Sequence, residues 1–136
     1  ARELPKVRPD FSVLSGDDNK TYMLLEAGGH GVVSVVSNFK PDLVAAMVDS
    51  YFSDKKEFSS VIDRVLGGLY KAAFLEGNPK SIKGIMRAAD MPAGPTRPPL
   101  YELRPETEVR LSETAAHYKT LSAGALEAEF FKSLIV

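Results

Sequence analysis

Apolar residues follow two different patterns along this chain, and the change between the patterns divides the sequence. Near the start, two short apolar runs at 11–14 and 32–36 are typical of buried β-strands. Between them lies a helical run over residues 20–27, which Gly28 and Gly29 are expected to end. Strand, helix and strand in this order predict a parallel βαβ unit whose strands are covered on both faces. Asp17, Asp18 or Asn19 is expected to cap its helix.

From residue 41 onward the apolar spacing is helical. Pro41 suits the first residue of a helix over 41–52, and steps of three and four from Phe58 to Phe74 predict a long amphipathic helix. Asn78-Pro79 and Pro105 predict two further helices, the second reaching Lys119. Residues 91–99 hold four prolines and predict an extended connection. The residues expected to face the core are Leu43, Val44, Met47, Val48, Tyr51 and Phe52 of the first helix and Ile82, Ile85, Met86 and Ala89 of the helix after Pro79. The helix from Pro105 has only partial apolar markers, which are Val109, Leu111, Ala115 and Tyr118.

Three stretches allow more than one interpretation. Gly67-Gly68 weakens the long helix, and close approach of another helix is the simplest explanation for it. After a break at 122–124, residues 125–136 form either an amphipathic turn on Leu126, Phe130 and Leu134 or a disordered tail. The opening residues 1–4 resemble the end of a helix, so we expect either a removed leader or the back part of a longer protein.

Composition excludes several classes of protein. The 136 residues suffice for one domain, and 44% apolar with 26% charged residues is ordinary for a globular chain. A net charge of −1 argues against a nucleic-acid binder, and no apolar run approaches the roughly 20 residues that span a membrane. Cysteine is absent, which excludes disulfides and thiolate metal sites and is compatible with a cytoplasmic location.

The candidate chemical motifs favour structural roles. Gly28-Gly29-His30-Gly31 follows a helix and precedes a strand, the reverse of a dinucleotide-binding loop, and His30 has no neighbouring ligand for a metal. Asp17-Asp18 follows a strand, where ligands bind in α/β folds, but adjacent side chains diverge and a helix cap is the simpler interpretation. None of the candidate lysines lies on a strand, so the residues alone predict no catalytic centre and no metal site; those considered were Lys20, Lys40, Lys71, Lys80 and Lys83.

The order of several motifs is nevertheless specific. The motifs are Gly16-Asp17-Asp18, Gly28-Gly29-His30-Gly31, Ser34, Asn38, Glu76, Asn78-Pro79, Lys83 and Arg97-Pro98. Over residues 1–120 this pattern resembles the C-terminal part of the dihydrodipicolinate synthases, in the wider family of pyruvate-dependent aldolases that includes N-acetylneuraminate lyase. Lys80-Ser81 departs from the Ile-Pro usual in that family.

The resemblance implies an α/β fold that is mostly helical in this chain. Residues 1–54 would be the last two βα units of a (β/α)8 TIM barrel, 55–120 a C-terminal helical domain, and 121–136 an extension. The family condenses pyruvate, held as a lysine Schiff base, with aspartate semialdehyde, and the resemblance implies no cofactor. The Schiff-base lysine and the other catalytic residues would precede Ala1, so the chain itself would hold none. The carried-over substrate-binding groups are the main-chain carbonyl of Val33, Gly16 and Asp17.

Three hypotheses follow, because two parallel strands cannot close a barrel and would leave unpaired edges. The chain is part of a synthase-like lyase of lysine biosynthesis, and assembles as a homo-oligomer or with a complementing barrel half. Alternatively, it is a non-catalytic helical assembly module. The third hypothesis is a fragment of a sugar-acid aldolase such as N-acetylneuraminate lyase. Partners are expected to include pyruvate and an aldehyde in the complete enzyme, but neither nucleic acid nor membrane.

Overall fold

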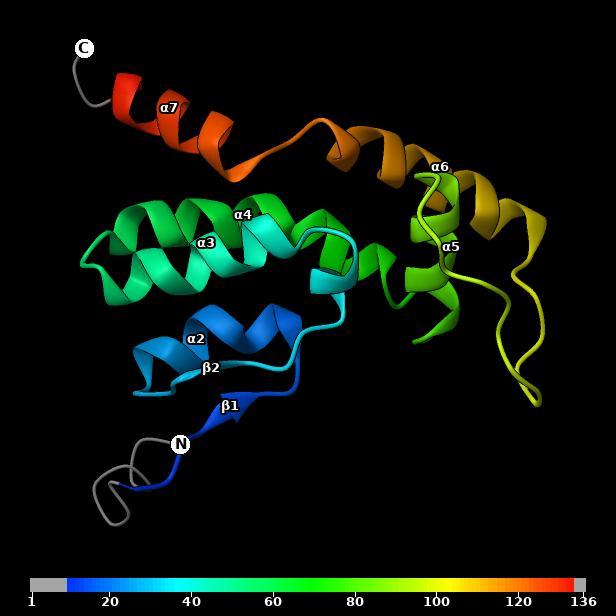
Figure 1. Cartoon of the computed structure of the whole chain (residues 1–136), viewed down its shortest axis with the longest axis horizontal. Helices are drawn as coiled ribbons and strands as arrows, with labels where there is room; N and C mark the ends of the chain where they lie inside the picture. The colour runs from blue at the N-terminus through cyan, green and yellow to red at the C-terminus, as the bar shows by residue number, and fades with distance from the viewer. Residues whose placement is uncertain (1–9, 134–136) are drawn as a thin grey trace.

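A computed structural model describes residues 10–133 of the chain (Figure 1). A small unit of two strands and a helix lies beside an antiparallel pair of helices. Two of the remaining helices pack against that pair, and the third packs mainly against one of these two. The expected helix end at residues 1–4 lies outside the described residues. The elements in chain order are β1 (Leu14–Ser15), a 3-10 turn η1 (Asp18–Lys20), α2 (Thr21–Glu26), β2 (Gly31–Val32), η2 (Val36–Asn38), α3 (Pro41–Phe52), α4 (Lys56–Ala72), α5 (Lys80–Ala88), α6 (Pro105–Lys119) and α7 (Ala123–Ser133).

The predicted βαβ unit is present, but its strands are much shorter than the apolar runs suggested. β1 and β2 pair in parallel, Leu14 with Gly31 and Ser15 with Val32. The predicted strand bounds of 11–14 and 32–36 are therefore wrong. The end of the second run turns into η2, where Val36 is fully buried against the helices rather than in a sheet.

The prediction that both faces of the strands are covered is also wrong for this chain. Phe11 and Leu14 are each 49% exposed, and Val33 is 68% exposed. Strand pairing in the described residues is confined to a two-stranded sheet, so each strand keeps one edge without a strand partner. An isolated strand pair is marginal in water. The apolar sequence of these strands is therefore suited to a larger sheet.

The core lies between the helices. α3 and α4 run side by side as an antiparallel pair (Figure 1), and Leu43, Met47, Ile62 and Leu66 are almost completely buried between the helices. Pro41 begins α3 as predicted, since the missing N–H of proline costs nothing in the first turn of a helix. Phe52, expected to be buried, is instead exposed at the end of α3, and two other residues of the apolar patterns are also exposed: Phe74 beyond the end of α4, and Val109 on α6.

α6 confirms the predicted bounds and explains one of the two adjacent glycines. Tyr118 of α6 reaches across α4, where its hydroxyl donates to the Val65 carbonyl at 2.6 Å and accepts from the Leu69 N–H at 3.1 Å. A Cβ on Gly68 would lie 2.8 Å from that hydroxyl oxygen. The close helix approach is thus confirmed for Gly68, whereas Gly67 has open space at its Cβ position and lines a cavity.

The described part of the tail forms a helix, α7 (Ala123–Ser133), so this part of the tail is not disordered. α7 begins at Ala123, so the predicted break at 122–124 extends only to Ser122. Its Phe130 ring packs 5.3 Å from that of Phe58. Lys40, itself buried, donates to the Leu121 carbonyl at 2.6 Å, which fixes the start of the tail against α3. Leu126 is half-buried against the core, and Leu134 lies outside the described residues.

The two adjacent glycines give a matched test of the packing. We expect Gly68→Ala to lower the free energy of unfolding by about 1–3 kcal/mol, because its methyl group displaces the Tyr118 hydroxyl from two hydrogen bonds. Gly67→Ala should instead raise it by up to about 1 kcal/mol, since alanine favours the helix and nothing obstructs it. Urea denaturation measures the free energy of unfolding of both variants. Equal effects of the two substitutions would contradict this packing.

Candidate functional site

The carboxylate of Asp18 joins the ends of the two strands. Asp18 is 3% exposed, and its oxygens accept hydrogen bonds from the Ser34 hydroxyl and from the N–H groups of Val35 (2.9 Å) and Val36 (3.2 Å). It therefore ties the loop after β1 to the loop after β2. The prediction that Asp17, Asp18 or Asn19 caps the following helix is wrong, because no side chain caps η1 or α2. The buried carboxylate instead serves the turn that follows the second strand.

An open cavity of about 670 Å³ lies where β1 ends, between its loop and α4. Gly16 and Asp17, two of the three predicted substrate-binding residues, line it. Asp17 is half-exposed and forms an ion pair with Lys20 at 2.9 Å. The volume falls within the range of small-molecule pockets. The residues that complete the wall are Asp18, Asn19, Asp63, Arg64, Gly67, Tyr70, Lys71 and Phe74.

The third predicted residue, Val33, is not among the residues that line this cavity. Its N–H donates to the Ser15 carbonyl at 2.8 Å, which extends the parallel ladder by one residue beyond β2. His30 extends the ladder before β2: its N–H donates to the Val13 carbonyl at 2.8 Å, and its Nδ1 accepts from the Val13 N–H at 3.1 Å. The structure thus places Gly16 and Asp17 together in a cavity and Val33 on the neighbouring strand end.

The α4 wall of the cavity holds a buried phenol and a partly buried carboxyl group. The Tyr70 hydroxyl donates to Asp63 at 3.3 Å. Burial, and then the nearby Asp63 charge, raise the pKa of Tyr70, so this phenol stays protonated and acts as a hydrogen-bond donor. Burial also raises the pKa of the Asp63 carboxyl group, and the Tyr70 hydrogen bond opposes this shift. The pair offers no group with the environment of a nucleophile.

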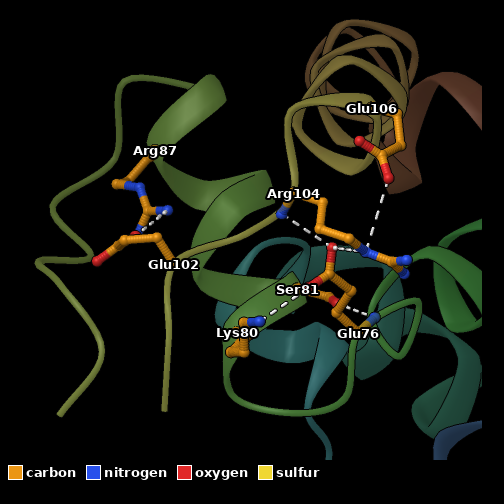
Figure 2. A network of polar contacts seen from close by, with 7 residues as sticks. All are labelled: Glu76, Lys80, Ser81, Arg87, Glu102, Arg104 and Glu106. Atoms are coloured by element: carbon orange, nitrogen blue, oxygen red, sulfur yellow. Dashed lines mark hydrogen bonds and ion pairs between the residues drawn. The ribbon is translucent and has the colours of Figure 1, made fainter. Parts of the chain in front are cut away.

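A second polar cluster surrounds Glu76, beyond the end of α4 (Figure 2). Its carboxylate accepts from Lys80 Nζ at 2.8 Å and from the Arg104 N–H at 3.0 Å, while its own N–H donates to the Ser81 hydroxyl at 2.9 Å. The hydrogen bond from Lys80, followed by those from Thr107 and Arg104, lowers the pKa of Glu76 to about 2. Lys80 and Ser81 are the residues that depart from the family's Ile-Pro, so the departure supplies two partners to Glu76. This cluster connects α5 to the start of α6.

Among residues 10–133, no group of three or more histidine, cysteine or acidic side chains could hold a metal ion. Over the same residues, no helix has both the length and the apolar character needed to cross a membrane. The five lysines considered as nucleophiles lie in helices or loops. Two are engaged in short contacts, Lys40 with Leu121 and Lys83 with the Pro95 carbonyl, each at 2.6 Å.

Two parallel strands joined through a helix, with a cavity at the carboxyl end of the first and further helices packed beside them, form a mostly helical α/β segment. Comparison with known proteins then identifies the family. The model of the dihydrodipicolinate synthetase family matches residues 2–118, so the chain belongs to that family.

Individual relatives agree with this assignment. The chain is 36% identical to the 4-hydroxy-tetrahydrodipicolinate synthase of Protochlamydia amoebophila over 105 residues, 77% of this chain and 35% of that protein. It is 38% identical to that of Haloarcula marismortui over 121 residues, 89% of this chain and 39% of the relative. The crystal structure of the dihydrodipicolinate synthase from Thermotoga maritima superposes with a TM-score of 0.80 at 36% identity, covering 86% of this chain and 40% of that one. The chain therefore spans only 35–40% of the length of these relatives.

Sequence reasoning missed the α4 side of the cavity. The long helix was interpreted from its buried residues, and the polar residues Asp63, Arg64, Tyr70 and Lys71 were not connected with a site. A signal was present in the sequence: Arg64, Gly67 and Lys71 are spaced by three and four residues and so share one face of the helix. The position of that face opposite Asp17 could not be predicted without the fold.

The Asp18 contacts generate a paired prediction. We expect Asp18→Asn to lower the free energy of unfolding by about 1–3 kcal/mol, because an amide offers one acceptor oxygen where three donors converge. Asp17→Asn should change it by less than about 1 kcal/mol, since it breaks only an exposed ion pair. Chemical denaturation of the two variants and the wild-type chain measures these free energies of unfolding. If Asp18→Asn lowers the free energy of unfolding no more than Asp17→Asn does, the strand ends do not depend on the Asp18 carboxylate.

The lowered pKa of Glu76 predicts a pH dependence. Because its folded-state pKa is about 2 against an ordinary 4.5, its contribution to stability is present above about pH 4.5 and is lost as the pH falls toward 2. The difference in thermal midpoint between the wild-type chain and Glu76→Gln should therefore shrink across this interval. Glu102→Gln is the control, since Glu102 is exposed and lies 3.9 Å from Arg87. If the difference in thermal midpoint between the wild-type chain and Glu76→Gln stayed constant across this pH interval, the lowered pKa of Glu76 would be contradicted.

Proposed function

We propose that this chain is the C-terminal segment of a lyase that condenses pyruvate, bound as a lysine Schiff base, with aspartate semialdehyde. Family membership supports the reaction class, and the relatives named above carry the synthase name. Related synthases have been solved with pyruvate, from Acinetobacter baumannii, and with lysine, from Cyanidioschyzon merolae. A cytoplasmic location and a homo-oligomeric state belong to the same proposal.

The observation that carries the proposal is the strand pair with its exposed apolar surface. β1 and β2 are two residues long, parallel and unpaired along their outer edges, and Phe11, Leu14 and Val33 are exposed beside them. These are the features of the last two strands of a barrel, β1 as strand seven and β2 as strand eight, whose neighbours lie elsewhere in the protein. A cavity of about 380 Å³ lies beside β2, with a mixed lining that includes Val32, Val44 and Asp49, and a neighbouring barrel element could occupy it.

In the proposal the chain contributes binding groups but no nucleophile. Gly16 and Asp17 form one wall of the pocket, and the carbonyl of Val33 faces the bound pyruvate. A main-chain carbonyl requires no particular side chain, so valine serves as well as isoleucine at this position. Residues 1–54 would close the barrel, 55–120 would form the helical domain and 121–136 the extension. α3 and α4 pack together across residue 54, so the first two parts share one core.

The proposal is tested by pyruvate trapping with borohydride, followed by mass spectrometry of the intact chains. We expect no pyruvate adduct on this chain alone. On mixing with a chain that carries strands one to six, the adduct should form on a strand-borne lysine of that chain, and turnover of aspartate semialdehyde should appear. An adduct on any lysine of this chain would refute the claim that the nucleophile lies outside it. A stable symmetric oligomer with no activity on mixing would favour the assembly module instead.

A further inference from the structure

The peptide unit between Val33 and Ser34 lies just beyond the parallel ladder and is free to contact a ligand. Within residues 10–133, neither the Val33 carbonyl nor the Ser34 N–H forms a hydrogen bond. The Val33 residue is 68% exposed, so the surface around this end of the ladder is open. A main-chain carbonyl that has no donor from the protein is a ready acceptor for a small ligand.

One short segment holds this peptide unit from both ends. On the N-terminal side, the Val33 N–H donates to the Ser15 carbonyl at 2.8 Å. On the C-terminal side, the carboxylate of Asp18 accepts from the Ser34 hydroxyl and from the Val35 N–H. Ser15 ends β1 and Asp18 begins η1, so both contacts come from the same few residues. Because a peptide unit is planar and rigid, contacts on both sides of it restrict the direction of the carbonyl.

The segment that makes these contacts is itself well held. Ser15 is 6% exposed, and its hydroxyl donates to the Asp17 carbonyl at 2.8 Å and accepts from the Asp17 N–H at 3.2 Å. The hydroxyl of Thr21, a fully buried residue, also donates to the Asp17 carbonyl, at 3.3 Å. The Asp18 side chain is therefore presented from a fixed turn rather than from a mobile loop.

The desolvation cost of the Asp18 carboxylate argues for more than a mechanical tie between the loops. A buried carboxylate is costly, and neutral groups of similar size often replace buried charges without loss of stability. What a neutral acceptor does not provide is two equivalent oxygens, which here accept from Ser34, Val35 and Val36 at the same time. The carboxylate therefore fixes three consecutive residues in one geometry, directly after the free carbonyl of Val33.

We propose that Asp18, together with Ser34, is a positioning residue, which fixes the direction in which the Val33 carbonyl meets the bound pyruvate. The inference rests on the proposed function, in which this carbonyl faces the pyruvate. A carbonyl dipole that is already fixed interacts more strongly with a bound ligand than a mobile one, because no orientational freedom is lost on binding. Asp18 acts through the Val33 carbonyl and not by contact with the substrate.

The first test measures the rigidity of this peptide unit in the chain alone by nuclear magnetic resonance. The Ser34 N–H lies in the same plane as the Val33 carbonyl, so the order parameter of the Ser34 N–H on the picosecond-to-nanosecond timescale reports on both. We expect about 0.85 in the wild-type chain and less than about 0.6 in Asp18→Asn and in Ser34→Ala. Ser34→Ala keeps the test valid if Asp18→Asn does not fold.

Two further variants serve as controls for this measurement. Ser34→Thr keeps the hydroxyl, and its added methyl group has room in the 380 Å³ cavity that Ser34 lines, so the order parameter should stay near about 0.85. Gly68→Ala disturbs the packing of α4 against Tyr118 and should leave the Ser34 N–H equally rigid. An order parameter near the wild-type value in both Asp18→Asn and Ser34→Ala would overturn the proposal, as would an equal loss in Gly68→Ala.

A second test separates this proposal from the function on which it rests. In the mixture with a chain that carries strands one to six, Ser34→Ala should raise the pyruvate concentration that half-saturates formation of the borohydride adduct by about tenfold. The KM for aspartate semialdehyde should stay unchanged, since the Val33 carbonyl faces the pyruvate. Gly68→Ala should leave both quantities unchanged, although it destabilises the chain.

The outcomes of this second test are distinct. If the adduct forms and Ser34→Ala leaves its pyruvate dependence unchanged, the positioning role is overturned while the proposed function stands. If Ser34→Ala and Gly68→Ala raise the half-saturating pyruvate concentration equally, general destabilisation is responsible and the positioning role also fails. Absence of the adduct in the wild-type mixture would overturn the proposed function, and the order parameters would then decide whether Asp18 fixes this peptide unit.

Discussion

The buried carboxylate of Asp18 is the interaction on which the N-terminal part of this structure depends. Two parallel strands of two residues each have too few ladder hydrogen bonds to hold their own register. Asp18 adds three hydrogen bonds between the loops at the strand ends, from Ser34, Val35 and Val36. Val36 continues directly into the helical core, where it is fully buried. One carboxylate therefore connects the strands, the cavity and the helices.

The helical part has a different source of stability. α3 and α4 share an extensive apolar core, which Tyr118 of α6 and Phe130 of α7 extend. Local clusters such as that of Glu76 fix the connections (Figure 2). Exposed apolar side chains occur in both parts, but those of Phe11, Leu14 and Val33 lie on or beside the strands. A segment of a larger barrel requires such residues there, because other strands would cover them.

The helices could be predicted from the sequence because their determinants are local. Pro41 and Pro105 mark two helix starts correctly, and apolar steps of three and four residues identify the long helix α4. The strand lengths could not be predicted, since an apolar run such as 32–36 does not show whether Val36 will pack in a sheet or against helices. Gly16 and Asp17 were placed in a pocket through family resemblance, whereas the opposing wall at Arg64 and Lys71 depends on a tertiary contact. Periodicity alone does not indicate which face of a helix lies across from a strand end.

The central claim is that β1 and β2 are the closing strands of a barrel whose other strands lie outside this chain. Hydrogen–deuterium exchange of this chain, alone and mixed with a chain that carries the first six βα units, tests this claim most directly. The account predicts that amides around Leu14–Ser15 and Gly31–Val32 exchange rapidly in the chain alone and become strongly protected in the mixture, while those of α4 change little. Strong protection of the strand amides in the chain alone, or no added protection on mixing, would contradict it.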